Sequence, residues 1–127
     1  MTQRPLSPHL QIYRPMLSMT MSILHRVTGL GLALGMSGLV LWLTAAATSD
    51  AYFAFMQGFF TSWIGRLLVF GMTWTLLHHM LGGLRYLLWD TGRGFALHHI
   101  EWMVRANLIG SVLLTLILWV GVYWVRA

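Results

Sequence analysis

Two adjacent histidines, a glycine pair and an arginine interrupt an apolar stretch in the middle of the chain. The stretch reads LHHMLGGLRYLLWD, from Leu77 to Asp90. Ionisable groups are costly inside a bilayer, so those found in an apolar span usually line a site or pair with another group. We therefore expect the chemistry of this protein to lie in this stretch.

His79 is the residue here that is best placed to bind a metal. At helical spacing it shares a face with Gly83 and Tyr86, and Gly82 lies close by, whereas His78 points about 100° away. A glycine turn beside an imidazole leaves a flat recess in which a planar macrocycle could lie against the backbone. Neutral histidine is an axial ligand of haem iron. The spacing therefore makes haem the candidate group that His79 binds.

Arg85 could assist in binding a haem. It lies about 9 Å further along the helix axis than His79, at 1.5 Å per residue, which is near where a propionate would reach. The alternative is that His79 only hydrogen-bonds a neighbouring helix, and that Gly82 and Gly83 allow close helix packing. The spacing leaves both interpretations open, because the chain supplies no obvious second iron ligand.

A second polar group, Ser22, His25 and Arg26, stands just before the first long apolar run. Ser22 and Arg26 are four residues apart, so they share one face of a helix. A hydroxyl and a guanidinium can both hold the oxygens of a polar headgroup, and a quinone carbonyl would suit them. The alternative for Arg26 is an ordinary interfacial anchor.

The composition is that of an integral membrane protein. The 127 residues are 57% hydrophobic and 9% charged, and the mean hydropathy is +0.69, far outside the soluble range. The basic residues are all arginines that mostly flank apolar runs, which argues against nucleic-acid binding. Because the chain has no cysteine, disulfides and thiolate-bound clusters are excluded, and any metal must use histidine or carboxylate.

Three apolar runs, at about 23–49, 64–89 and 105–125, are each long enough to cross a hydrocarbon core of about 30 Å. The sequence therefore predicts an all-α fold with three transmembrane helices. Residues 51–62, which follow Asp50, are uncharged and rich in aromatic rings, so they are expected at the membrane interface. His98, His99 and Glu101 are expected in the loop between the second and third spans. A second metal site there is conceivable, but an exposed polar loop is the favoured interpretation.

Residues 1–21 contain all three prolines and cannot form one helix. We expect an N-terminal arm that docks on a partner subunit, the alternative being a disordered tail, and a membrane anchor formed by residues 22–127. The arginines divide six to two between the two ends of the spans: Arg4, Arg14, Arg26, Arg85, Arg93 and Arg105 against Arg66 and Arg126. This division predicts that the N-terminus lies on the cytoplasmic side.

Four blocks of sequence carry a resemblance to a known family. They are RPLSPH at 4–9, SILHRVTG at 22–29, His79 with Gly83-Leu84-Arg85, and Trp89-Asp90 with Gly92 and Gly94. Together they resemble the cytochrome b membrane-anchor subunits of succinate dehydrogenase, respiratory complex II. The likeness covers most of the chain and includes the three-span layout.

The resemblance implies a subunit without a succinate-oxidising site of its own, which binds haem b and ubiquinone. Such an anchor passes electrons from an iron–sulfur subunit to ubiquinone, linking the tricarboxylic acid cycle to the respiratory chain, while a flavoprotein subunit oxidises succinate. By similarity His79 is one axial ligand, and a second small anchor subunit supplies the other. His25, Arg26 and Arg85 match positions near the propionates, and Ser22 with Arg26 matches the quinone contacts. Tyr86 stands where many members carry a second histidine.

The expected location is a bacterial inner membrane, because the chain starts at Met without an Arg-rich and Ser-rich transit segment; the alternative is the mitochondrial inner membrane. Two other functions stay open. One is the anchor of a quinol:fumarate reductase, which works in the opposite direction. The other is a cofactor-free structural anchor or small transporter subunit, in which the histidines are polar core contacts.

Overall fold

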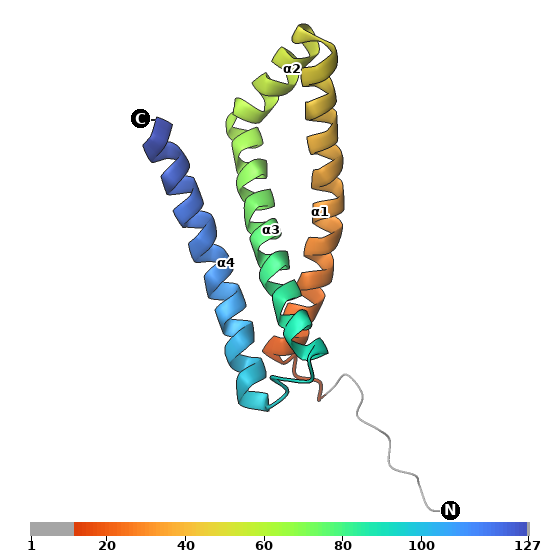
Figure 1. Ribbon diagram of the computed structural model, residues 1–127, viewed down its shortest axis with the longest axis vertical. Coiled ribbons are helices and arrows are strands. Elements are labelled where there is room, and N and C mark those ends of the chain that lie inside the picture. Colours follow the sequence, from red (N-terminus) through yellow and green to blue (C-terminus); the bar gives the residue numbers. More distant parts are fainter. Residues whose placement is uncertain (1–11, 127) are drawn as a thin grey trace, which may run out of the picture.

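The computed structural model describes residues 12–126, and the regular secondary structure of this part of the chain is α-helix alone. It forms four helices: α1 (Leu17–Thr48), α2 (Asp50–Thr61), α3 (Trp63–Asp90) and α4 (Leu97–Arg126) (Figure 1). The helices α1, α3 and α4 are long and apolar enough to cross a membrane. The prediction of three transmembrane helices is therefore confirmed.

The three long helices extend beyond the apolar runs read from the sequence. They contain 32, 28 and 30 residues, or about 42–48 Å at 1.5 Å per residue, against a hydrocarbon core of about 30 Å. The expected boundary between arm and anchor falls inside α1, because residues 17–21 are already helical. Residues 1–11, which include the RPLSPH block, lie outside the described part of the chain.

The connection between α3 and α4 is short. Gly92 and Gly94 adopt positive φ values of 75° and 81°, a conformation that glycine reaches without a steric penalty. The chain re-enters a helix at Leu97. The prediction that His98, His99 and Glu101 lie in a loop was therefore wrong: they form the first turns of α4, where Glu101 pairs with Arg105 at 3.5 Å, one helical turn away.

The expected interfacial segment is the helix α2, which is joined to α1 and α3 by single serines. The backbone at Ser49 and Ser62 is extended, and each hydroxyl caps the helix that follows, accepting from Tyr52 N at 3.4 Å and from Gly65 N at 3.2 Å. Such caps satisfy N–H groups at the start of a helix that would otherwise lack a partner. These two caps allow the chain to turn sharply at both ends of α2.

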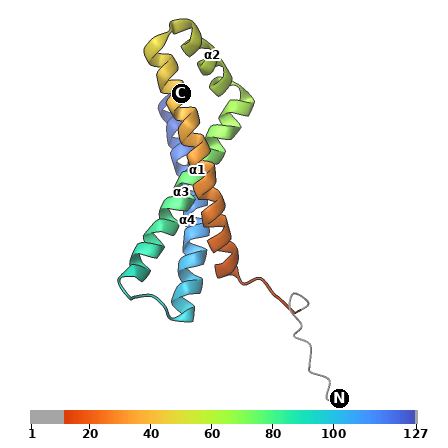
Figure 2. The same ribbon diagram turned by 90° about the vertical axis from the view of Figure 1, so that its right-hand side faces the viewer.

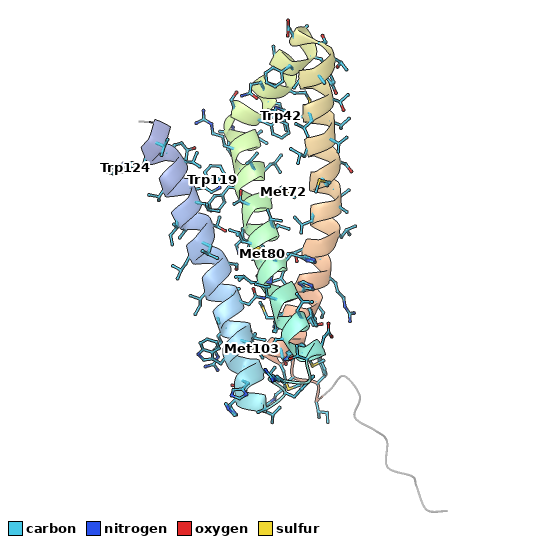
Figure 3. The ribbon with its side chains drawn as sticks, in the orientation of Figure 1. Trp42, Met72, Met80, Met103, Trp119 and Trp124 are labelled. Atoms are coloured by element: carbon cyan, nitrogen blue, oxygen red, sulfur yellow. The ribbon has the colours of Figure 1, made fainter. Side chains whose placement is uncertain are left out.

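The helix α3 packs between α1 and α4. The N-terminal end of α1 and the α3–α4 connection lie at one end of the molecule, and α2 lies at the other (Figure 1). Figure 2 shows α1 and α3 crossing one another. Trp42, Trp119 and Trp124 lie in the half that carries α2, and Met103 lies near the opposite end (Figure 3).

Polar side chains are prominent among the buried residues, while many large apolar side chains are exposed. This is the reverse of a soluble protein and suits a chain whose solvent is hydrocarbon. The buried polar residues are Thr28, His78, Arg85, Asn107, Ser111 and Thr115. The interior of the bundle is thus where function is to be sought.

Candidate functional site

The imidazoles of His25 on α1 and His79 on α3 lie face to face. Their ring centroids are 4.0 Å apart and their planes differ by 7°. The Nδ1 atom of His79 also lies 3.1 Å from the carbonyl oxygen of His25. A carbonyl oxygen can only accept, so this contact requires that Nδ1 of His79 carries the proton and donates it.

This hydrogen bond fixes the tautomer of His79. With the proton on Nδ1, the lone pair of Nε2 is available to a metal. Within residues 12–126 the hydrogen-bonding contacts of the His79 ring, to His25 and to the Thr28 hydroxyl at 3.4 Å, are made by Nδ1. Metal-binding histidines commonly donate their other N–H to a backbone carbonyl in this way. The donor set around His79 therefore fits an axial ligand of haem iron.

Two glycines make room for the two rings. A Cβ atom on Gly29 would lie 3.0 Å from Cε1 of His79, and a Cβ atom on Gly82 would lie 2.5 Å from Nδ1 of His25. Each glycine thus receives the imidazole of the other helix. The recess expected at Gly82 is filled by His25, whereas a Cβ atom on Gly83 would meet nothing within 4 Å, so Gly83 borders open space.

Ser22 and Tyr86 extend this cluster toward the N-terminal end of α1. The two hydroxyl oxygens lie 3.3 Å apart, close enough for a hydrogen bond in which either can donate. The Tyr86 ring centroid is 5.1 Å from that of His25. Ser22 therefore has a partner on α3, while the side chain of Arg26, its expected neighbour on α1, is exposed.

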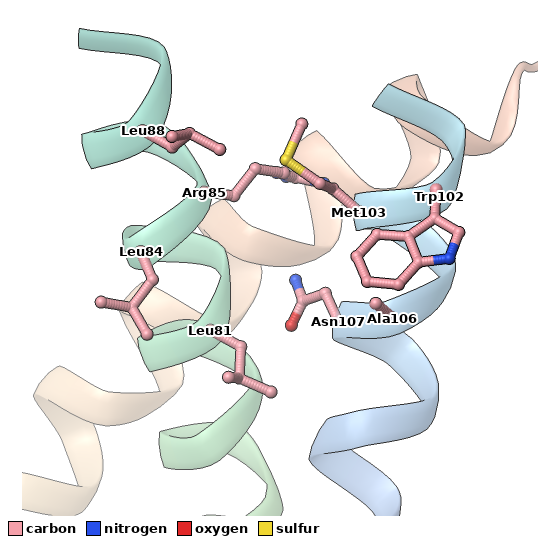
Figure 4. A pocket seen from close by; sticks show the side chains of 8 residues that line it. All are labelled: Leu81, Leu84, Arg85, Leu88, Trp102, Met103, Ala106 and Asn107. Carbon is pink, nitrogen blue, oxygen red and sulfur yellow. The ribbon is translucent and has the colours of Figure 1, made fainter. Parts of the chain in front are cut away.

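His78 and Arg85 make contacts toward α4, although the Arg85 guanidinium also lies 5.4 Å from the ring of Tyr86. His78 is fully buried, and its Nδ1 lies 3.3 Å from the hydroxyl oxygen of Ser111 on α4. This agrees with the predicted divergence of the two neighbouring histidines. Arg85 lines a pocket between α3 and α4 (Figure 4), with its Cζ atom 5.0 Å from the ring centroid of Trp89.

The structure therefore brings together Ser22, His25, His79 and Gly82 of the predicted site residues. It places Arg85 on the α4 side of α3, and leaves Arg26 and Gly83 at the exposed border of the cluster. Sequence reasoning missed three residues near these positions: Thr28, Asn107 and Ser111. Asn107 and Ser111 are four residues apart in an apolar span, and this spacing of polar residues was the signal that could have found them.

The first turns of α4 do not form a metal centre with other residues of the described chain. The rings of His98 and His99 lie 4.0 Å apart, but within residues 12–126 no group of three or more histidine or carboxylate side chains could hold a metal ion. His79 therefore stays the candidate metal ligand of this chain.

The sequence was compared with known proteins. The family model described as "Succinate dehydrogenase/Fumarate reductase transmembrane subunit" matches residues 1–122. The chain is 40% identical over 114 residues to the "Succinate dehydrogenase cytochrome b556 subunit" of Paracoccus denitrificans, a match that covers 90% of this chain and 88% of the relative.

Relatives from other organisms give the same result. The protein of the same name from Rickettsia conorii is 36% identical over 118 residues, which covers 93% of this chain and 92% of the relative. The "Succinate dehydrogenase cytochrome b560 subunit, mitochondrial" of Sus scrofa is 36% identical over 116 residues, which covers 88% and 68%. The sequence blocks therefore indicated the family correctly, and the chain belongs to the succinate dehydrogenase/fumarate reductase transmembrane subunit family.

Proposed function

We propose that this chain is the haem b- and ubiquinone-binding membrane anchor of a succinate dehydrogenase, and that it passes electrons from the iron–sulfur subunit to ubiquinone. One observation carries the proposal: the His79 ring is held through Nδ1 by the carbonyl oxygen of His25, which leaves Nε2 free to ligate iron. The names of the relatives, which are cytochrome b subunits of succinate dehydrogenase, support it.

In this proposal His79 supplies one axial ligand of the haem, and a second small anchor subunit supplies the other. His25 and the exposed Arg26 bind the propionates. Gly83, beside which there is open space, is the glycine that faces the macrocycle, while Gly82 accommodates the His25 ring. Arg85, which the family resemblance also implied, lines the α3–α4 pocket instead, and we leave it out of the haem site.

The residues of this chain have separate tasks. A bound haem supplies one-electron chemistry at its iron. The carbonyl oxygen of His25 orients the His79 ring by accepting the hydrogen bond from Nδ1–H, which leaves Nε2 free. Ser22 and Arg26 bind the quinone: the Ser22 hydroxyl donates to a carbonyl oxygen while its own oxygen accepts from Tyr86, and the Arg26 guanidinium adds a charged donor.

The proposal also includes the surroundings of the chain. The flavoprotein, the iron–sulfur subunit and the second anchor subunit are its partners, and the N-terminal arm docks beneath the iron–sulfur subunit. The anchor lies in a bacterial inner membrane with its N-terminus in the cytoplasm. The bacterial relatives and the six-to-two division of arginines support this location.

A pair of neighbouring variants tests the proposal. In the purified complex, His79→Gln should abolish the low-spin b-type absorption and the bound haem, because glutamine is a poor iron ligand. His78→Gln is the matched control and should keep both, since its side chain lies toward Ser111 and an amide can still hydrogen-bond there. A spectrum left unchanged by His79→Gln, with the complex intact, would remove His79 as ligand.

The family name itself keeps one alternative open. It covers fumarate reductase subunits as well, and the same anchor would serve an enzyme working from quinol to fumarate. Comparing the rates of succinate oxidation by quinone and of fumarate reduction by quinol in one preparation decides the direction. The absence of any haem absorption in that preparation would favour a cofactor-free anchor, in which His25 and His79 only pack helices together.

A further inference from the structure

A pocket of about 260 Å³ lies between α3 and α4, on the α4 side of α3. Figure 4 shows the Arg85 side chain and the Asn107 amide reaching into this space from the two helices. The haem and quinone site proposed above does not use either residue. The pocket is therefore a separate feature, which needs an explanation of its own.

The polar groups of this pocket lack partners. Arg85 and Asn107 are each only 5% exposed. Within residues 12–126 no hydrogen-bond partner is found for Nε and Nη1 of Arg85, or for Nδ2 and Oδ1 of Asn107. Leaving buried donors and acceptors unpaired is costly, and more so for a charged group in a membrane. A ligand that hydrogen-bonds to these atoms of Arg85 and Asn107 would remove this cost.

The guanidinium is also held in position. Its Cζ atom lies 5.0 Å from the Trp89 ring and 5.4 Å from the Tyr86 ring, distances at which a cation is attracted to an aromatic face. None of the residues that line the pocket carries a carboxylate, so the positive charge has no counter-charge there. An anion with several acceptor oxygens matches two guanidinium N–H groups and one amide N–H group.

The position of the pocket identifies the source of such an anion. Arg85 lies five residues before the end of α3, about 7.5 Å along the helix axis, and the exposed Trp102 borders the pocket. Tryptophan is typical of the membrane interface, at the depth of lipid headgroups. The other wall includes Leu84 and Leu88, which are exposed to the surroundings of the bundle, so an acyl chain can follow them.

We infer that this pocket binds an anionic phospholipid, with its phosphate on Arg85 and Asn107 and its acyl chain along the leucines of α3. The Oδ1 atom of Asn107 can accept from a headgroup hydroxyl, which phosphatidylglycerol has and phosphatidylcholine lacks. The inference does not depend on the haem, because the proposed haem and quinone site uses neither Arg85 nor Asn107, although the Arg85 guanidinium lies 5.4 Å from the ring of Tyr86. The bound lipid belongs to the leaflet on the side of the α3–α4 connection.

The test uses the purified complex, washed with detergent to remove lipid. Added phosphatidylglycerol should raise its thermal unfolding temperature and be retained in native mass spectra, whereas phosphatidylcholine or inorganic phosphate should do neither. Asn107→Asp, which sets a carboxylate against the phosphate, and Asn107→Leu should raise the half-saturating lipid concentration about tenfold or more, the factor expected for one lost charge-assisted hydrogen bond. Arg66→Gln, at an exposed arginine near the start of α3, is the control and should leave that concentration unchanged.

The outcomes separate the possibilities. A full response to phosphatidylglycerol in Asn107→Asp would overturn the site, as would equal stabilisation by phosphatidylcholine. Equal stabilisation by inorganic phosphate would overturn the assignment to a lipid. The haem spectrum of each variant is recorded in the same sample, so that failure of this inference is distinguished from failure of the proposed haem site.

Discussion

His25 and His79 contact each other twice: the rings stack with centroids 4.0 Å apart, and the carbonyl oxygen of His25 lies 3.1 Å from Nδ1 of His79. The first contact fixes the plane of the His79 ring and the second fixes its tautomer. A single residue of α1 thus orients the proposed iron ligand on α3. Substitutions around this pair should therefore disturb the packing of α1 on α3.

The two neighbouring glycines of α3 should respond differently to the same change. Gly82→Ala places a methyl group where His25 lies, 2.5 Å from its Nδ1, so we expect a loss of about 1–3 kcal/mol of stability from overpacking. Gly83→Ala meets nothing within 4 Å in this chain, so it should leave the packing of α1 on α3 intact. Because Gly83 faces the macrocycle in the proposed site, its added methyl group should lower the haem-to-protein ratio instead. The two variants are compared by the thermal unfolding temperature of the purified complex and by its haem-to-protein ratio. Equal effects of the two variants would contradict the placement of His25 against Gly82.

The hydrogen bond between Ser22 and Tyr86 can be tested by a double-mutant cycle. Ser22→Ala and Tyr86→Phe should each slow quinone reduction while succinate oxidation by an artificial dye is unchanged. Because the hydroxyls contact each other at 3.3 Å, the double variant should lose less than the sum of the two, by about 0.5–1.5 kcal/mol. Strict additivity would show that the two hydroxyls act independently.

Ser111 should stabilise the α3–α4 contact without affecting the haem. Its hydroxyl donates to the carbonyl oxygen of Leu108 at 2.9 Å and so can accept from His78 Nδ1. Ser111→Ala leaves that buried nitrogen unpaired, at a cost of about 1–3 kcal/mol. The control is Ser37→Ala on α1, an exposed serine bonded to its own helix at Ala33. We expect a lower unfolding temperature for Ser111→Ala only, with the absorption spectrum of both variants unchanged.

The joint between α2 and α3 has a strict requirement for glycine at position 65. A Cβ atom there would collide with the backbone of Phe59 and Phe60, which cannot move aside as the end of a side chain can. Gly65→Ala should therefore destabilise the protein more than Gly82→Ala does and lower its yield in the membrane. Gly71→Ala, in the same helix, has nothing within 4 Å of the added atom and should have no such effect. Yield and unfolding temperature, compared across the three variants, check this order.

The apolar runs predicted the three membrane-crossing helices because hydrocarbon thickness sets a minimum length for an uncharged span. They did not predict where the helices begin. Helices continue past the hydrocarbon into polar residues, as α1 does through Ser22 and α4 through His98. A hydropathy profile does not detect this continuation.

The candidate site was only partly predictable, for a similar reason. Helical spacing correctly separated the directions of His78 and His79, since the angle between neighbours is a property of one helix. It could not say which helix covers each face. That His25 fills the recess at Gly82, and that Arg85 lines the pocket with Asn107, depends on how α1 and α4 pack on α3.

The short helix α2 has a consequence for the shape of the whole bundle. Its 12 residues span about 18 Å, nearly twice the 8–10 Å that separates the axes of packed helices. It acts as a spacer that keeps the adjoining ends of α1 and α3 apart, so the two helices form a wedge that narrows toward the N-terminal end of α1 (Figure 1). Lengthening or shortening α2 by a turn would change the opening angle of that wedge, and with it the fit at the narrow end, without altering any residue of the proposed haem site.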